Sequence, residues 1–279
     1  WAVHDPADRA GLAYLASTKA GRRIYLNRAL LDADVVFPVG LLSFEPLHGH
    51  RGPWSLVFPG LSDPETRSAL DGSEQDLLEE AGEVSWLLGC QLQMGVVAGQ
   101  SGAHQVLVAE DSVMRRAGVD AVDAAWQFTV PDRSEVVLAG VSRDLGDGQT
   151  LDDLASALSS ATSAVRQGGK VVLLSQVSGP PGPAFRAMAE ADDPRQGPSL
   201  LRKARPSDDL RAARMVALAL AWADVYLVSR LDPDFVESLG ILPLEQPPEA
   251  RRILASASSL NVMASANRTR VRVEADRDA

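Results

Sequence analysis

The stretch SEVVLAGVSRDLGDGQTLDDLASALSSATSAVRQGGKVVLLSQ (residues 134–176) decides the fold class of this chain. Residues 134–140 and 170–176 are continuous apolar runs of strand length. Residues 151–169 between them have helical spacing, and the pair Gly168-Gly169 is predicted to end that helix. A strand, a helix and a strand in this order form a βαβ unit, in which the strands are parallel and the helix covers the sheet. The stretch therefore predicts an α/β protein.

The same alternation continues toward the end of the chain. Two further helices are predicted at 206–223 and 247–260, and two further strands at 224–229 and 269–275. The loop SGPPGPA (178–184) follows a predicted strand, where open α/β sheets commonly bind ligands.

The first part of the chain mixes strands and helices in a less regular order. The predicted strands are 22–27, 34–40, 91–99 and 104–110, and the predicted helices are 74–89 and 112–126, the last interrupted by Gly118. A Pro- and charge-containing segment then separates two regions, so we expect one domain over 1–127 and a second over 128–279. The last strand could return to the first domain. Both domains are expected to hold parallel or mixed sheets flanked by helices.

Composition and charge restrict the partners. The chain has 279 residues, of which 46% are hydrophobic and 23% charged, as is ordinary for a globular protein. Its net charge of −10 disfavours nucleic acid, because an acidic surface repels phosphate backbones. The short basic runs at 202–205 and 268–272 are interpreted as solvated faces.

The sequence also predicts no membrane segment and no disulfide. The longest apolar stretch, MVALALAWADVYLV (215–228), is broken by Asp224 and is too short to span a bilayer. No signal peptide is visible, although the chain begins at Trp1 rather than at Met. A single cysteine, Cys90, lies among apolar residues and is expected to be buried and inert. These features are typical of a cytoplasmic protein.

The stretch SFEPLHGHRGPWSLVFPG (43–60) contains two of the four histidines and is the first candidate for chemistry. His48 and His50 are two residues apart, so on an extended loop they point to opposite sides and form a poor chelating pair. A packed turn, in which both histidines bind backbone or solvent, is the alternative interpretation.

The segment HDPADRAGLAYLASTKAGRRIYLNRALLDADVVFPVG (4–40) resembles the nickel-dependent lactate racemase family in the order and spacing of its motifs. The matched residues are His4-Asp5-Pro6, Tyr14-Leu15, Ser17-Thr18-Lys19, Gly21, Tyr25-Leu26-Asn27-Arg28, Ala33-Asp34 and Gly40. The resemblance continues more weakly through 91–117 and 128–275. It therefore covers nearly the whole chain, but only the latter two-thirds or so of a complete family member. The family's front part, with its DDxTRP-type motif and a catalytic His, has no counterpart here.

The resemblance implies an isomerase with its active site in the cleft between two domains. Family members racemise or epimerise 2-hydroxy acids at a nickel ion, which is held in a nucleotide-derived pincer cofactor attached to a Lys. Two His residues act as acid and base on the substrate hydroxyl. A small 2-hydroxy acid or similar carboxylate is accordingly the expected ligand.

The family's active-site loop matches this chain without a gap from Gly40 to Gly60, but its chemical residues are changed. Glu45 stands at the position of the catalytic His, Ser55 at that of the cofactor Lys and Asp71 at that of a nickel-binding His. Two further family residues, a Gln and a Lys that hold the substrate carboxylate, match Ala157 and Ser160. Gly49 and Gly52 fall on family glycines, with Arg51 between them. The resemblance implies a nickel pincer cofactor. Because serine has no amine, however, Ser55 cannot form the covalent link that the family's lysine makes to this cofactor.

Three interpretations remain open. The first is an isomerase in which Glu45, His48 or His50 supplies the missing acid and base. The second is a catalytically silent or nickel-independent relative that binds a small molecule or a partner, with Trp54 filling the space beside the cofactor position. The third is an enzyme of another kind that uses Glu45 with one of the two histidines. Glu45 could equally form an ion pair with Arg51, and Asp71 could serve only a turn. The sequence leaves the oligomeric state open.

Overall fold

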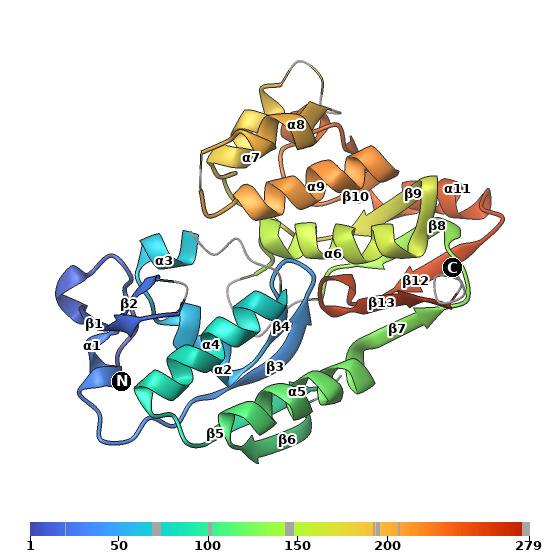
Figure 1. The fold of residues 1–279 in the computed structure, drawn as a ribbon. Helices are drawn as coiled ribbons and strands as arrows, with labels where there is room; N and C mark the ends of the chain where they lie inside the picture. Colours follow the sequence, from blue (N-terminus) through green and yellow to red (C-terminus); the bar gives the residue numbers. More distant parts are fainter. Residues whose placement is uncertain are drawn as a thin grey trace. The chain divides into compact units, whose positions relative to one another are not determined.

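The computed structural model describes residues 1–279 except 20, 69–73, 100, 101, 143–147, 192, 194, 195, 206 and 275–279. The described residues form two compact units, one of Trp1–Phe44 with His48–Ala125 and one of Glu45–Leu47 with Trp126–Ala279. Both units mix helices and strands, so the protein is of the α/β class, as predicted (Figure 1). No helix within the described ranges is both long and apolar enough to cross a bilayer.

The first unit contains a two-stranded and a four-stranded sheet. Its helices and strands are η1 Arg9–Gly11, β1 Leu12–Ser17, β2 Arg23–Asn27, α1 Arg28–Leu31, β3 Val39–Glu45, β4 Gly49–Arg51, α2 Pro53–Ser55, η2 Leu56–Gly60, α3 Pro64–Ser68, α4 Glu74–Leu88, β5 Gln93–Ala98, β6 Ala103–Ala109 and α5 Asp111–Trp126. The larger sheet has the order β4-β3-β5-β6, with β3 and β5 parallel and β5 and β6 antiparallel.

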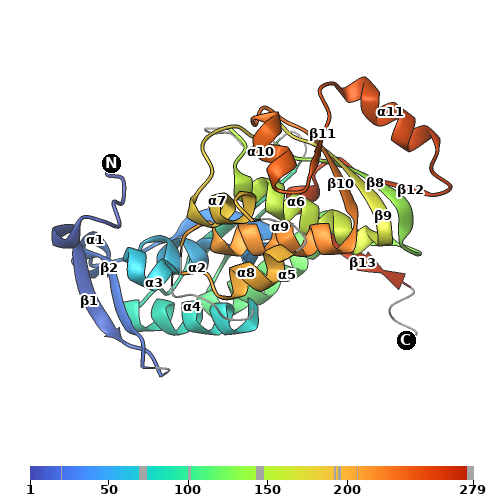
Figure 2. The same ribbon diagram turned by 90° about the horizontal axis from the view of Figure 1, so that it is seen from above.

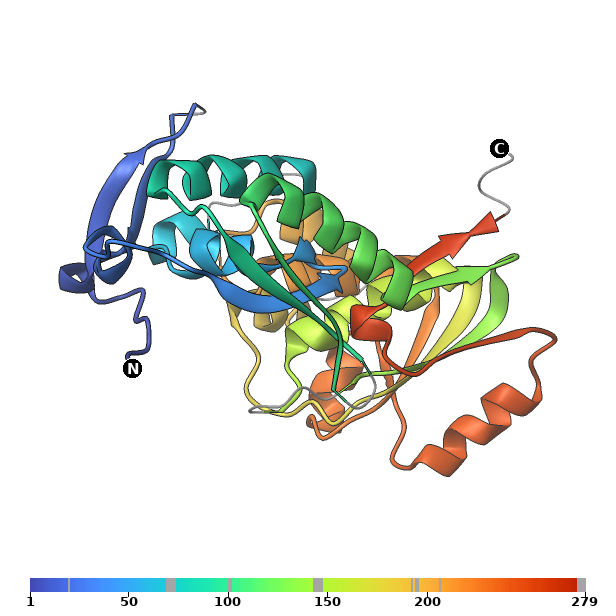
Figure 3. The same cartoon turned by 90° about the horizontal axis from the view of Figure 1, so that it is seen from below.

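Helix α5 packs on one face of this larger sheet. Leu42 of β3 and Val97 of β5 are fully buried on that face, and the methionine sulfur of Met114 lies against Gly95. Helix α4 lies beside α5 (Figure 3). The Arg115 guanidinium of α5 donates to the Leu78 carbonyl of α4 over 2.9 Å. The unit therefore has a core between one sheet face and its helices.

The second unit is built on a parallel sheet with the order β11-β10-β9-β8-β12. Its helices and strands are β7 Gln127–Val130, β8 Ser134–Gly140, α6 Leu151–Ala164, β9 Val165–Leu174, α7 Pro183–Ala189, α8 Gly197–Arg202, α9 Leu210–Trp222, β10 Asp224–Val228, α10 Pro233–Ser238, β11 Leu242–Pro243, α11 Pro247–Ala255, β12 Leu260–Met263, η4 Ala266–Arg268 and β13 Arg270–Val273. The βαβ unit predicted from residues 134–176 is confirmed, because β8 and β9 are parallel neighbours. The last strand, β13, pairs with β7 within this unit.

Helices cover both faces of the parallel sheet (Figure 2). Helices α6 and α9 contribute most of the helical side chains to the larger apolar core on one face. On the opposite face, Ala250 of α11 packs with Val136 and Val172. A parallel sheet buried on both faces explains why its strands read as continuous apolar runs rather than alternating ones.

Several predicted boundaries are wrong. The helix predicted at 206–223 begins only at Leu210, and the helix predicted at 247–260 ends at Ala255, so that Leu260 instead begins strand β12. Residues 34–38 are not part of a strand, and β3 begins at Val39, because its partner β5 begins only at Gln93. Helix α6 ends at Ala164 instead of continuing to Gly169, and β9 begins at Val165, opposite Ser134. Gly168, with φ of 72°, lies where the register shifts within β9, so the glycine pair forms an irregularity in a strand rather than the end of a helix.

A further correction concerns α5, which continues through Gly118 without a break. A Cβ at this position would approach the Leu42 side chain to 2.7 Å and the Trp54 ring to 3.3 Å. The glycine therefore allows close packing of the helix on the sheet rather than interrupting the helix.

Candidate functional site

The loop at 43–60 folds as the end of β3, a turn, the short strand β4 and two helical turns, α2 and η2. Gly49 begins β4 with φ of 73°, a conformation that favours glycine. The sequence-predicted site residues of this loop fall into both units: Glu45 belongs to the second unit, whereas His48, His50, Arg51 and Ser55 belong to the first.

The hydroxyl of Ser55, at the position matched to the cofactor lysine, makes hydrogen bonds within its own turn. Its hydroxyl donates to the Gly52 carbonyl over 2.7 Å and accepts from the Gly52 amide over 3.1 Å. The Trp54 side chain is only 1% exposed, and a Cβ at Gly52 would overlap its ring. These contacts make residues 52–55 a tightly packed structural turn.

His50 is buried and pairs with an aspartate from a distant helix. Its Nε2 lies 2.9 Å from Oδ1 of Asp123 on α5, and its ring centroid is 5.0 Å from that of Phe44. The imidazole is 4% exposed and the Asp123 side chain 25%. A carboxylate that holds an imidazole in this way fixes the orientation of the ring. His48 is half-buried.

Glu45 acts on an arginine that sequence analysis assigned to a solvated face. Arg268, in η4, is half-buried, and this burial lowers its pKa while the charge of Glu45 opposes the shift. The interpretation of residues 268–272 as a wholly solvated run is therefore wrong at Arg268.

The two positions matched to the family's substrate-binding residues have become part of the core. Ala157 is 0% exposed and Ser160 3%, and the Ser160 hydroxyl donates to the Thr269 carbonyl over 2.7 Å. Both side chains lie on α6, which packs against η4. Neither is placed to hold a ligand in this structure.

His4 and Cys90 lie in structural environments. Asp71 lies outside the described residues. His4 has a structural position: Asn27 Nδ2 donates to its Nδ1 over 3.0 Å, and its Nε2 donates to the Ser62 carbonyl over 3.1 Å. Cys90 is buried, as predicted, and burial together with the charge of Asp111 raises the pKa of its thiol to about 11.

Asp123 and Arg268 are the residues that sequence reasoning missed. Asp123 is an ordinary acidic residue on an amphipathic helix, 73 positions from His50, and no local pattern pairs the two. Arg268 could have been suspected only from its alternation with Arg270 and Arg272, which also describes a surface strand.

The described residues do not fit a lysine-linked nickel cofactor. Ser55 has no amine and its hydroxyl is already bonded. Among the side chains that the structure describes, no three His, Cys, Asp or Glu residues gather in a way that could hold a metal ion. We therefore derive no chemical step through that group.

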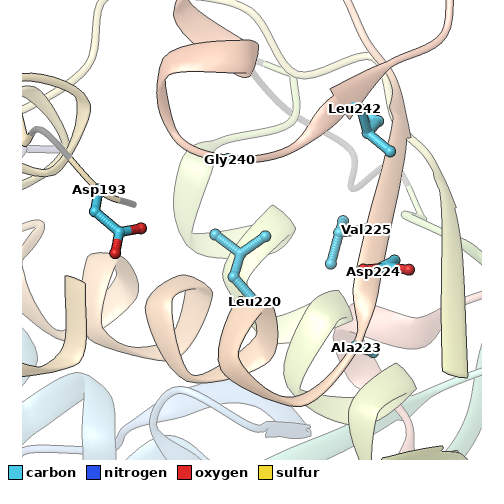
Figure 4. A pocket seen from close by; sticks show the side chains of 7 residues that line it. All are labelled: Asp193, Leu220, Ala223, Asp224, Val225, Gly240 and Leu242. Carbon is cyan, nitrogen blue, oxygen red and sulfur yellow. The ribbon is translucent and has the colours of Figure 1, made fainter. Parts of the chain in front are cut away.

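A small pocket of about 220 Å³ lies elsewhere in the second unit, where β10 begins (Figure 4). Its lining residues are Asp193, Leu220, Ala223, Asp224, Val225, Gly240 and Leu242. The pocket is at the amino-terminal end of β10, whereas open α/β sheets bind ligands at the carboxyl ends of their strands. Its two acidic side chains also make it a poor site for a carboxylate.

Comparison with known proteins identifies the fold. The lactate racemase apoprotein from Thermoanaerobacterium thermosaccharolyticum superposes with a TM-score of 0.80 at 15% identity, covering 96% of this chain and 70% of that one. A protein from Thermotoga maritima superposes with a TM-score of 0.67 at 12% identity, covering 97% of this chain and 77% of that one. No known family model matches the sequence, and none of the curated proteins is significantly similar to it. The protein therefore has a lactate racemase-like α/β fold.

Proposed function

We propose that this protein uses its lactate racemase-like fold to bind a small carboxylate, of the 2-hydroxy acid class, without a lysine-linked nickel cofactor. The observation that carries the proposal is the closed turn at Gly52–Ser55. Here the position matched to the cofactor lysine is a serine, whose hydroxyl both donates and accepts a hydrogen bond within the turn. A serine cannot form the amine-derived link. The protein is then a nickel-independent or catalytically silent relative.

The ligand class is supported by the fold and by one cation. The similar structure is that of a lactate racemase, and lactate is a 2-hydroxy acid. Arg268 is half-buried, and a guanidinium can bind a carboxylate through two parallel hydrogen bonds. A ligand carboxylate would compete with Glu45 for this group, so the proposal predicts binding that depends on Arg268.

The cofactor part of the proposal is tested by producing the protein in a host that makes the nickel pincer cofactor. Elemental analysis is expected to find no stoichiometric nickel, and intact mass spectrometry no covalent adduct. Stoichiometric nickel together with an adduct would overturn the proposal.

The binding part is tested by calorimetric titration with lactate and other 2-hydroxy acids. Arg268→Gln is expected to weaken binding by at least about tenfold, since it removes a charge-assisted contact. Arg272→Gln is the matched control, because Arg272 is exposed on β13. Equal affinities of the two variants would contradict a role for Arg268.

A second candidate is a racemase or epimerase of 2-hydroxy acids that works through hydride transfer at the nickel pincer cofactor. It is favoured by the extent of the structural match, which covers 96% of this chain. A racemisation assay on the same preparation separates the two candidates. An active enzyme with bound nickel would support the second, whereas an active enzyme without nickel that loses activity in Glu45→Gln would point to another chemistry based on that carboxylate.

A further inference from the structure

The short helix η4, which carries Arg268, begins at the carboxyl ends of two parallel strands. Met263, the last residue of β12, pairs with Ala139 of β8. Just beyond this pair, a Cβ at Gly140 would come within 2.9 Å of the Ala264 carbonyl, so the two segments leave the sheet in close contact. Open α/β sheets commonly bind ligands at the carboxyl ends of their strands. The turn that carries Arg268 therefore starts at the edge of the sheet that suits a binding site.

The side chain of Asn267 ties η4 to the end of β8. Asn267 is buried, with 3% of the residue exposed. Its Oδ1 accepts two hydrogen bonds from Ser142, which follows β8: one from the backbone amide over 2.9 Å and one from the hydroxyl over 3.0 Å. Because a backbone N–H can only donate, this contact fixes which end of the Asn267 amide faces the strand.

The other end of the same side chain ties η4 to helix α6. Asn267 Nδ2 donates to Oδ1 of Asp153 over 3.2 Å. The second oxygen of Asp153 accepts from the backbone amide and the hydroxyl of Thr150, each over 2.9 Å, as part of the capping box of α6. Asn267 thus joins η4 both to a strand end and to the first turn of a helix.

The backbone on the other side of Arg268 is fixed as well. The Thr269 carbonyl accepts from the Ser160 hydroxyl over 2.7 Å, and the Thr269 hydroxyl donates to the Ser265 carbonyl over 2.7 Å. The Arg268 amide itself donates to the Ser265 carbonyl over 3.1 Å. Arg268, whose side chain is half-buried, is therefore carried on a backbone that is held before and after it.

We propose that Asn267 is a positioning residue, which holds Arg268 in place for the carboxylate of a small 2-hydroxy acid. This inference rests on the proposed function, because it specifies how the same arginine is presented to the ligand. The negative charge of Glu45 already acts on the Arg268 guanidinium, so a carboxylate can lie beside it. An arginine loses conformational freedom when it binds, and a support fixed in advance reduces that cost. Asn267 acts only through the turn and does not touch the ligand.

The test is calorimetric titration of the whole chain with lactate and with lactamide, its uncharged analogue. The wild type is expected to bind lactate more tightly than lactamide, because the Arg268 guanidinium recognises the charge. Asn267→Ala is expected to raise the dissociation constant of lactate by about two- to tenfold and to leave that of lactamide nearly unchanged. A merely structural role would weaken the binding of both ligands alike, and so would leave the ratio of the two constants as it is.

Asn261→Ala is the matched control. Asn261 is an asparagine of the same unit, half-buried and hydrogen-bonded to the Ala164 carbonyl over 3.3 Å, but it lies near the amino-terminal end of β12. This control is expected to keep the wild-type ratio. The double variant of Asn267→Ala with Arg268→Gln is expected to bind lactate no more weakly than Arg268→Gln alone, because the first residue acts through the second.

Folding of each variant is verified by circular dichroism. Where Asn267→Ala does not fold, Ser142→Ala takes its place, since it removes only the hydroxyl contact with Asn267 and keeps the backbone one. Its ratio is expected to shift in the same direction by a smaller factor. Lactate binding that depends on Arg268 but keeps the wild-type ratio in these variants would overturn the inference and leave the proposed function standing. A wild type that binds no 2-hydroxy acid, or binds it as Arg268→Gln does, would overturn the proposed function and this inference together.

Discussion

Trp54 and Trp86 are expected to contribute very differently to stability, because one is buried and the other is exposed. Trp54 is 1% exposed and packs among Gly52, Gly118 and the core of the first unit, whereas Trp86 on α4 is 78% exposed. Trp54→Ala is expected to lower the free energy of unfolding by about 3–5 kcal/mol, because it removes apolar contacts and leaves a cavity. Trp86→Ala is expected to change it by less than about 1 kcal/mol. Urea unfolding followed by circular dichroism measures both, and similar losses would contradict the assigned packing.

The pairing of His50 with Asp123 can be isolated by a double-mutant cycle. His50→Ala alone leaves the partly buried carboxylate without this partner, so a loss of about 1–3 kcal/mol is expected. Asp123→Ala is expected to cost a similar amount, and the double variant less than the sum of the two. Unfolding free energies of the four proteins give the coupling. A coupling near zero would mean that the contact adds nothing to stability.

The raised pKa of Cys90 predicts that the stability of the protein depends on pH in the alkaline range. Burial raises the pKa of its thiol to about 11 from an ordinary value of 9.0, so the folded chain keeps the proton that the unfolded chain loses first. The contribution of the protonated Cys90 thiol to the free energy of unfolding is therefore complete below pH 9, and it is lost as the pH rises from about 9 to about 11. The difference in unfolding free energy between wild type and Cys90→Ala, measured across this range, is expected to shrink. A constant difference would contradict the raised pKa.

At the scale of elements, the contact of α5 with β3 explains why a glycine lies inside a helix. An alanine at position 118 would gain up to about 1 kcal/mol in helix propensity. Its Cβ would, however, come within 2.7 Å of a Leu42 side chain that is itself 1% exposed and has little room to move. Overpacking of this kind costs about 1–3 kcal/mol, so Gly118→Ala is expected to destabilise the protein by about 1 kcal/mol.

The measurement for Gly118→Ala is again urea unfolding, with Ser112→Ala as the control on an exposed position of the same helix. The control is expected to stay within about 0.5 kcal/mol of the wild type. A Gly118→Ala protein more stable than the wild type would show that the contact can relax.

At the scale of the whole molecule, each unit has buried side chains of its own. Leu158 on α6 is 0% exposed within the core of the second unit. Leu158→Ala is expected to cost about 2–5 kcal/mol and to lower hydrogen-exchange protection mainly in 126–279. Trp54→Ala is expected to do so mainly in 48–125. Mass spectrometry of exchanged peptides distinguishes the two patterns, and uniform loss of protection in both variants would mean that the units open together.

Much of the fold could be predicted because the signals are local. The runs at 134–140 and 170–176 became β8 and β9, and the helical spacing at 112–126 became α5. Boundaries were less predictable. The helical pattern of α6 continues past Ala164, yet Val165 is taken into the sheet, where Ser134 pairs with it and the Trp222 indole donates to its carbonyl. Tertiary contacts overrode the local preference of these residues.

The candidate site was less predictable than the fold. The sequence singled out the loop at 43–60 and matched Ser55 to a family lysine, because a motif is a local pattern, and that match stays a prediction. It could not show that the Ser55 hydroxyl is already bonded, nor that Glu45 would lie near Arg268. Those contacts depend on how the chain folds around the loop.

The sequence by itself determined the α/β class, the parallel βαβ unit and the lack of a lysine in the loop at 43–60. Hydrophobic period and residue type are properties of neighbouring positions, so they can be read without the fold. Only the tertiary structure decided that His50 meets Asp123 and that the Ser160 hydroxyl donates to the Thr269 carbonyl. The physical reason is that each of these contacts joins segments that are far apart in the chain. Such a contact forms only once the sheet and its helices have packed.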